Sequence, residues 1–503
     1  MPSIIRSGLA VALAVLLGRL LGFGREATIA ATFGISQQAD VAVFLIGLPD
    51  FLINVLGAGG FTAILVIAYR QRPGQAARLM MQAGLSVLAG ITLLAVLMIA
   101  FRGVLTDLLA PGFVPEARQL AIDLLPPVLL SAPVAAMTGA AIAFLQARDR
   151  FFIAASGTAI INITLIAALV IAPDGEALAT LAGAVLLAAI LRWLLLALAI
   201  GRESFRGLST RPWLVDRALV AAFGRSAVSE SVVFLYPFAL NALTTLYGIG
   251  ALAAVSYATK LVQLPLGALM MTMTTILLPR MAQAAPREGA GDAVRFERLV
   301  RSGMVWMAII GIISMAILVF EGTTLARLTF GWGAIPPEGL ERIGTHVGVL
   351  ALMLVPMGLN NLMRRTLNAL GDTRVALRAE LAGFAVFLVL ALLSVVLSAP
   401  QDVLLATVSV GHLAAGLVLA GALRQRGVRV GRMLAAPESL RTLVLVAVAT
   451  LTPLLLLALF APSQAGIEVR ALVVAFAGAA GVLAAVLGTA DGRQVLTRLR
   501  RRR

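Results

Sequence analysis

Apolar runs of about 20 residues recur along the entire chain, and only short polar segments separate them. A helix needs about 20 mainly apolar residues to cross the hydrocarbon of a bilayer, so each run predicts one membrane span. The sequence therefore predicts an all-α polytopic membrane protein with about fourteen transmembrane helices. The predicted spans are 4–33, 40–69, 77–101, 120–146, 152–172, 177–200, 226–247, 251–278, 299–320, 344–370, 375–397, 403–423, 443–460 and 469–487.

Arginine is distributed unevenly between the predicted loops. The even-numbered loops are rich in it, as at Arg148 and Arg150 or between Arg280 and Arg298, whereas the odd-numbered loops are short and poor in it. Lys and Arg are retained on the cytoplasmic side of a membrane, so both termini are predicted to be cytoplasmic. The basic tail at 498–503 fits this orientation and is expected to touch anionic headgroups of the phospholipid bilayer.

Composition supports the membrane assignment and removes several other classes of protein. The chain is 60% hydrophobic and 13% charged with a mean hydropathy of +0.99, whereas a soluble domain is about a quarter charged. Its net charge of +16 comes from the loop arginines rather than from a basic patch with aromatics, which argues against nucleic-acid binding. With no Cys and only two His, neither a disulfide framework nor a thiolate or His-rich metal site is expected.

An internal repeat is visible in the fourth and tenth predicted spans. Pro133 precedes an apolar segment, the turn Arg148-Asp149-Arg150 and a new apolar run, and Pro356 precedes the corresponding turn at Gly371 to Arg374. The spacing predicts two six-helix lobes in a parallel pseudo-two-fold repeat, followed by two additional helices. The predicted domains are an N-terminal lobe at 1–201, an interfacial linker at 202–225, a C-terminal lobe at 226–425, and two further helices with a basic tail at 426–503.

Several ionisable side chains lie inside the apolar runs, where each charge costs at least about 2.5 kcal/mol. Gly22 and Gly24 in the first span favour a bend and the close approach of a neighbouring helix or ligand. Beyond Arg6, the charges in the first two spans are Arg19, Arg25, Glu26, Asp40 and Asp50, and the only Lys, Lys260, lies in the eighth.

Two interpretations of these charges stay open. In the first, they pair with one another and hold the first two helices together. In the second, they line a water-filled cationic cavity between the lobes, where arginines from one lobe and Lys260 from the other clamp a phosphate or pyrophosphate.

Other polar residues carry a weaker signal. Glu230 and Asn360 are interpreted equally well as interhelical hydrogen-bonding groups or as ion ligands. His346 and His412 are expected to be packing residues rather than a proton relay.

The opening of the chain resembles a known family. The segment at 18–34, GlyArgLeuLeuGlyPheGlyArgGluAlaThrIleAlaAlaThrPheGly, is similar to the signature of the MurJ/MviN family of lipid II flippases in the multidrug/oligosaccharidyl-lipid/polysaccharide exporter superfamily. Further similar segments follow in the family's order at 39–40, 48–50, 110–113, 133–151, 161–162 and 275–279. The resemblance implies fourteen helices with both termini inside and a hydrophobic groove for the lipid tail formed by the last two helices.

By this resemblance, the substrate-binding residues are Arg19, Arg25, Asp40 and Lys260, the last replacing an Arg, and Asp40 holds Arg side chains while the site is empty. Asp50 and Asn54 are further candidates for cavity or gating residues, together with Glu26, Glu230 and Asn360. The chain departs from the family at Ile53, where an Arg is usual, and in the Gly-rich segment at 57–61, which lacks the usual acidic residue. These departures make family membership a firmer inference than the identity of the head group.

The resemblance implies a transporter rather than an enzyme. This transporter would move a polyprenyl-pyrophosphate glycolipid across the bacterial inner membrane by alternating access, and would serve peptidoglycan synthesis and cell shape. No nucleotide-binding loop is present, so no cofactor is expected, and coupling to membrane potential, Na⁺ or H⁺ stays open. Cell-wall synthesis proteins are candidate partners. The alternatives are a flippase for another polyprenyl-linked oligosaccharide, a cation-coupled exporter, a membrane glycosyl- or phosphotransferase, and a scaffold without transport activity.

Overall fold

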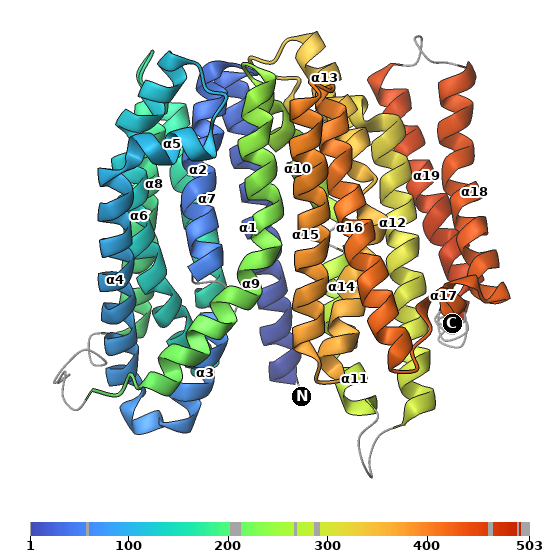
Figure 1. Ribbon diagram of the computed structural model, residues 1–503, viewed down its shortest axis with the longest axis horizontal. Coiled ribbons are helices and arrows are strands. Elements are labelled where there is room, and N and C mark those ends of the chain that lie inside the picture. Colours follow the sequence, from blue (N-terminus) through green and yellow to red (C-terminus); the bar gives the residue numbers. More distant parts are fainter. Residues whose placement is uncertain are drawn as a thin grey trace. The chain divides into compact units, whose positions relative to one another are not determined.

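The computed structural model describes residues 2–56, 60–201, 213–265, 269–285, 292–460, 466–489 and 492–493. Within these ranges, the side chains at 2–16, 50–56, 60, 63, 218, 222, 225–233, 271–272, 274–276 and 373 are not described. Every regular element in the described part of the chain is a helix, which confirms the predicted all-α class (Figure 1).

The chain forms two compact units, and unit 1 comprises Met1–Ala253 and Gly333–Ile335. Its α-helices are α1 (Pro2–Phe33), α2 (Gln37–Leu56), α3 (Gly60–Gln71), α4 (Ala76–Ala100), α5 (Arg102–Leu109), α6 (Pro115–Ala147), α7 (Phe151–Ile171), α8 (Ala177–Ile200) and α9 (Arg217–Thr244). Short 3₁₀ helices lie at η1 (Pro73–Gln75) and η3 (Thr245–Tyr247).

Unit 2 comprises Ala254–Trp332 and Pro336–Arg503. It contains most of α10 (Ala251–Pro265), followed by α11 (Met271–Ala284), α12 (Ala293–Phe330), α13 (Pro337–Ala351), α14 (Leu354–Ala369), α15 (Thr373–Val396), α16 (Gln401–Gln425), α17 (Val430–Ala435), α18 (Pro437–Phe460) and α19 (Ile467–Gly488).

Each predicted span coincides with one helix or with two successive helices. Nine helices in the described part of the chain are long and apolar enough to cross a membrane, and α13 with α14 makes a tenth if this pair, bent by 41°, is one span. The chain is thus a multi-pass membrane protein, while the count of about fourteen spans stays a prediction.

Proline explains one of the interruptions inside predicted spans. Pro356 lies in the first turn of α14, directly after the bend of 41° that separates α14 from α13. Proline has no backbone N–H to donate to the preceding turn, so a continuous helix breaks or bends at this position. The bend does not lower hydropathy, which is why the apolar run alone predicted a single span.

Small side chains bring the helices of unit 1 together. Helix α6 packs between α4 and α8, and its buried face includes Ala121, Ala132 and Ala140. Tyr69 of α3 and Phe144 of α6 are fully buried beside this face, with ring centroids 5.9 Å apart in an edge-to-face arrangement. Membrane helices associate through such close van der Waals packing because lipid supplies no hydrophobic drive between them.

Helix α12 packs against the last two helices of unit 2. It contacts both α18 and α19, and these two lie side by side in Figure 1. Buried Val305, Ile309 and Val446 join α12 to α18 near one end, and Ala316, Leu454 and Ala477 join all three helices farther along.

The two predicted repeat turns have the same backbone structure. Asp149 has a φ of 60° and Gly371 a φ of 84°, which is the left-handed conformation that ends many helices. In both turns the N–H of the next residue reaches back to the helix, from Arg150 to the carbonyl of Leu145 and from Asp372 to that of Leu367, each at 2.9 Å. The local likeness supports the repeat, while the relation between the lobes stays a prediction.

The predicted domain boundaries also stay predictions. Of the linker at 202–225, residues 202–212 lie outside the described part of the chain, and α9 begins at Arg217. The compact unit 1 includes α9, whereas the sequence assigned residues from 226 onward to the second lobe.

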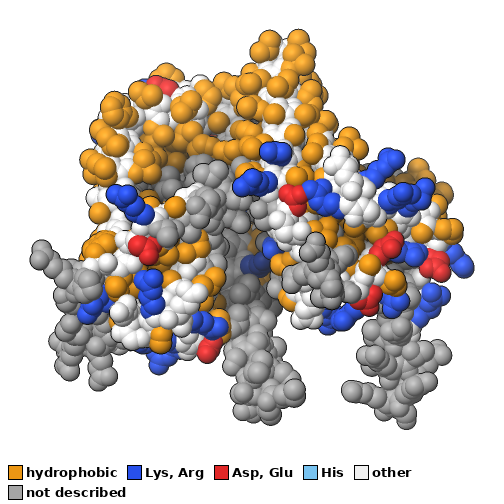
Figure 2. Space-filling model, turned by 60° about the horizontal axis from the view of Figure 1, so that its bottom comes forward, with side chains coloured by type: hydrophobic (Ala, Val, Ile, Leu, Met, Phe, Trp, Pro, Cys, Tyr) orange, Lys and Arg blue, Asp and Glu red, His pale blue; other side chains and the backbone are white. Residues whose placement is uncertain are grey.

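Basic side chains gather at the ends of the helices. Figure 2 shows Lys and Arg there and hydrophobic side chains along the helix flanks. This separation is expected for helices whose apolar flanks face lipid and whose ends face water.

Candidate substrate site

Arg19 lies beside the face of α1 that packs on α7. Gly18 and Gly22 form this face, and a Cβ atom at Gly22 would lie 3.5 Å from the amide nitrogen of Asn162. Asn162 is buried and donates from Nδ2 to the carbonyl oxygen of Gly18 at 3.1 Å. The neighbouring helix that the glycines were expected to admit is therefore α7, and Arg19 on the adjacent face of α1 is exposed.

Arg25 and Glu26 form an ion pair within α1. The Nη2 atom of Arg25 lies 2.6 Å from Oε1 of Glu26, and the two side chains are only 9% and 5% exposed. A buried guanidinium and carboxylate in contact compensate each other's charge, which offsets the large cost of removing either one from water. The pairing interpretation therefore describes this contact, although the pair lies within one helix rather than between the first two.

Asp40 of α2 is buried and accepts two backbone hydrogen bonds at the start of α10. Its Oδ2 lies 2.6 Å from the amide nitrogen of Gly250, and its Oδ1 lies 2.7 Å from that of Ala253. The first N–H groups of a helix have no partner inside the helix, and a carboxylate there is favoured both by hydrogen bonding and by the helix dipole. Asp40 thus caps a helix that is distant in sequence, and its predicted role in holding arginines stays a prediction.

Gly250 is required by this cap. Its φ of 75° is in the left-handed region, and a Cβ atom there would lie 2.3 Å from Cγ2 of Ile35. Only glycine adopts this conformation without strain and leaves room for Ile35 beside the N–H group that Asp40 binds.

Lys260 lies in α10 and is half-buried. It belongs to unit 2, whereas Arg19, Arg25 and Asp40 belong to unit 1. The clamp formed by Lys260 and the arginines therefore stays a prediction.

The remaining candidates divide into two groups. Asp50 and Asn54 lie in α2 and Glu230 lies in α9, but their side chains are outside the described residues. Asn360 of α14 is buried and donates from Nδ2 to the carbonyl oxygen of His412 in α16 at 2.6 Å. This contact is an interhelical hydrogen bond of the kind that the sequence offered as one of two interpretations.

Unit 2 contains a buried ion pair that was not predicted from the sequence. Glu321 of α12 is 2% exposed, and its two carboxylate oxygens lie 3.1 Å and 3.2 Å from Nη1 of Arg470 in α19. Thr324 adds a hydrogen bond from its hydroxyl to Glu321. The signal was present, because Arg470 lies inside one apolar run and Glu321 directly follows another.

In the described part of the chain, no group of three or more His, Asp or Glu side chains is placed to hold a metal ion.

Solved transport proteins share this fold. The chain matches "Lipid II flippase MurJ, inward closed conformation" with a TM-score of 0.77 and 18% identity, over 97% of this chain and 100% of that one. It also matches an inward-facing MATE family transporter of the MOP superfamily with a TM-score of 0.69 and 16% identity, over 83% of this chain and 96% of that one. The chain therefore has the fold of a polytopic helical membrane protein, which it shares with these solved structures.

Sequence comparison narrows the class to one family. The family described as "Lipid II flippase MurJ" matches residues 29–474, so the chain belongs to the MurJ family. A probable lipid II flippase MurJ of Synechocystis sp. is 25% identical over 399 residues, which are 75% of this chain and 73% of that protein. The lipid II flippase MurJ of Burkholderia cenocepacia is 25% identical over 371 residues, which are 70% of this chain and 71% of that protein.

Proposed function

We propose that this protein is a flippase that moves lipid II, a polyprenyl-pyrophosphate-linked peptidoglycan precursor, from the inner to the outer leaflet of the bacterial inner membrane. The observation that carries the proposal is the family match over residues 29–474, which includes Asp40 and Lys260. The mechanism is alternating access, and membrane potential, Na⁺ or H⁺ supplies the energy. Both termini are cytoplasmic, and cell-wall synthesis proteins are its candidate partners.

In this mechanism, exposed Arg19 binds the pyrophosphate first. A guanidinium binds phosphate oxygens through two parallel hydrogen bonds, whereas Lys260 contributes a compact point charge. Arg25 reaches the substrate only by exchanging its contact with Glu26, so the substrate competes with a carboxylate that is already in place. This competition gives a physical reason for release as well as for binding.

Reconstitution in liposomes tests the proposal. The parent protein is compared with Arg19→Ala and Lys260→Ala in vesicles that contain lipid II, and the rate of head-group appearance in the outer leaflet is measured. We expect the parent to exceed protein-free vesicles and each variant to lose at least about tenfold, the effect of one lost charge-assisted hydrogen bond. Arg429→Ala removes an exposed arginine after α16 and serves as the matched control. Equal rates for parent and protein-free vesicles would refute the flippase.

A flippase for another polyprenyl-linked oligosaccharide is the second candidate, because Ile53 occupies the position where the family usually has an Arg. A polyprenyl-pyrophosphate oligosaccharide without peptide is the second substrate in the same vesicles. Faster movement of this lipid, together with failure to rescue a strain depleted of its lipid II flippase, would replace the first candidate with the second.

A further inference from the structure

A cavity of about 390 Å³ lies at one end of the α12, α18 and α19 group, within unit 2. Three arginines line it, Arg298 and Arg301 from α12 and Arg493 after α19, and Glu438 is the single acidic residue among its described lining residues. We call it the α12–α18–α19 cavity. Its excess of positive charge favours an anionic ligand.

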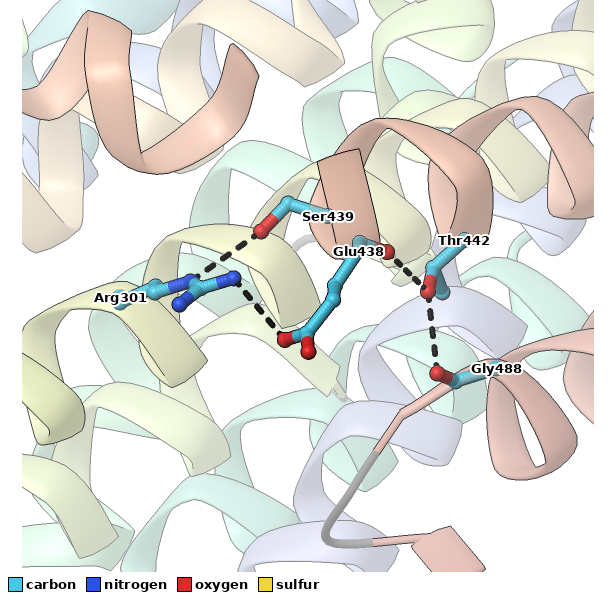
Figure 3. Close-up of polar contacts among 5 residues, drawn as sticks. All are labelled: Arg301, Glu438, Ser439, Thr442 and Gly488. Atoms are coloured by element: carbon cyan, nitrogen blue, oxygen red, sulfur yellow. Dashed lines mark hydrogen bonds and ion pairs between the residues drawn. The ribbon is translucent and has the colours of Figure 1, made fainter. Parts of the chain in front are cut away.

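The cavity is a built site rather than a gap between mobile side chains. In Figure 3, Arg301 extends toward the first turn of α18, where its Nε lies 3.3 Å from Oγ of Ser439 and its Nη2 lies 3.3 Å from Oε2 of Glu438. Thr442 links α18 to α19, because its hydroxyl contacts the carbonyl of Glu438 at 2.7 Å and that of Gly488 at 3.1 Å. Ser439 and Thr442 are both buried, so the wall behind the guanidinium is fixed.

Glu438 marks the place that the ligand would take. Its side chain is 86% exposed, and its contact with Arg301 is long for a charge-assisted hydrogen bond. Exposed ion pairs of this kind contribute about 0 to 1 kcal/mol, so an anion with better geometry displaces the carboxylate easily. A phosphate there would receive the fork of Arg301 and the charge of exposed Arg298.

Apolar side chains also lie on the helices that form the cavity. Trp306 is one of its lining residues, while Val444 of α18 is 53% exposed and Leu487 of α19 is 50% exposed. Tryptophan is enriched at the boundary between headgroups and hydrocarbon, and exposed apolar flanks face acyl chains. We propose that the α12–α18–α19 cavity binds the phosphate of an anionic membrane lipid, whose acyl chains lie along α18 and α19.

Native mass spectrometry of the purified full-length protein tests this site. Phosphatidylglycerol is titrated against phosphatidylcholine with the same acyl chains, and we expect phosphatidylglycerol to bind about tenfold more tightly. Arg298→Gln and Arg301→Gln should each weaken phosphatidylglycerol binding about tenfold. Arg295→Gln is the matched control, because Arg295 is exposed one turn earlier in α12 and does not line the cavity.

Two further variants separate binding from folding and from transport. Glu438→Gln removes the competing carboxylate and should tighten phosphatidylglycerol binding about threefold or more, an outcome that misfolding cannot produce. Arg19→Ala should leave it unchanged, so this binding is measured independently of lipid flipping.

Three outcomes would overturn the inference. Arg295→Gln weakening phosphatidylglycerol binding as much as Arg301→Gln would mean diffuse attraction by surface charge. Equal binding of phosphatidylcholine would remove the preference for anionic lipid. Complete displacement of the lipid by millimolar inorganic phosphate would mean that the cavity takes a soluble anion instead.

Discussion

Glu321 and Arg470 form a buried ion pair between α12 and α19 at the point where α12 bends. Glu321 has non-helical backbone angles, with φ of −122° and ψ of 21°, and its carboxylate lies 3.1 Å from Nη1 of Arg470. The next residue, Gly322, lies so close to α13 that an added Cβ would be 2.6 Å from the carbonyl oxygen of Gly344. The bend, the close packing of α13 and the attachment of α19 therefore depend on the same few residues.

Glu321→Ala is expected to destabilise unit 2, because it leaves the charge of Arg470 without its carboxylate. Breaking a buried pair costs about 3 to 5 kcal/mol, and the value here should lie at the low end because Arg470 is 23% exposed. Thermal unfolding in detergent, followed by tryptophan fluorescence, measures the change. The double variant Glu321→Leu with Arg470→Leu is the control and should recover most of the loss. A Glu321→Ala variant as stable as the parent would show that the ion pair does not contribute to stability.

Removal of Arg19 and removal of Arg25 are expected to have different effects on stability. Arg19 is exposed, so Arg19→Ala should change stability by less than about 0.5 kcal/mol while transport falls at least about tenfold. Arg25→Ala should lower stability by about 3 kcal/mol because Glu26 then remains buried and charged. Thermal unfolding and vesicle transport are measured on the same preparations.

The double variant Arg25→Ala with Glu26→Gln decides what Arg25 does. It removes both charges and should regain most of the lost stability. Recovered transport would assign Arg25 a structural role, whereas lost transport in a stable protein would show that Arg25 contacts the substrate.

Substitutions of Asp40 are expected to lower stability in the order that a helix cap predicts, with Ala costing more than Asn. Asp40→Ala removes both acceptors at the start of α10 and should cost about 2 kcal/mol or more, since buried N–H groups lose their partners. Asp40→Asn keeps one acceptor oxygen and should cost about half as much. Asp292→Asn is the matched control, because Asp292 caps α12 at an exposed, local site and should lose only a few tenths of a kcal/mol. Equal losses of stability for Asp40→Asn and Asp40→Ala would contradict the cap.

The helices could be predicted from the sequence because of the physics of the bilayer. Backbone groups in hydrocarbon must be satisfied within one segment, so an apolar run of sufficient length has to be helical. Hydropathy alone does not locate the bend between α13 and α14, because Pro356 removes an N–H donor from the helix and leaves hydropathy unchanged.

The candidate site was less accessible from sequence, because its contacts join distant residues. The Arg25 and Glu26 contact is local, and pairing among these charges was one of the two interpretations of the sequence. The partners of Asp40 are backbone N–H groups 210 and 213 residues away, and a backbone group has no sequence signature. Arg470 lies 149 residues from Glu321, so each charge was visible alone but their pairing was not.

Asn360 and Gly416 are expected to act as one unit between α14 and α16. A Cβ atom on Gly416 would lie 2.7 Å from Oδ1 of Asn360, so Gly416→Ala should rotate the amide and break its hydrogen bond to the carbonyl of His412. The bond is worth about 0.6 to 1.7 kcal/mol in a membrane protein, and the steric cost adds about 1 kcal/mol or more. In an Asn360→Ala background, the methyl group of Gly416→Ala fills vacated space and should cost almost nothing. A double-mutant cycle of thermal stability measures this coupling, and strictly additive losses would show that the two residues act independently.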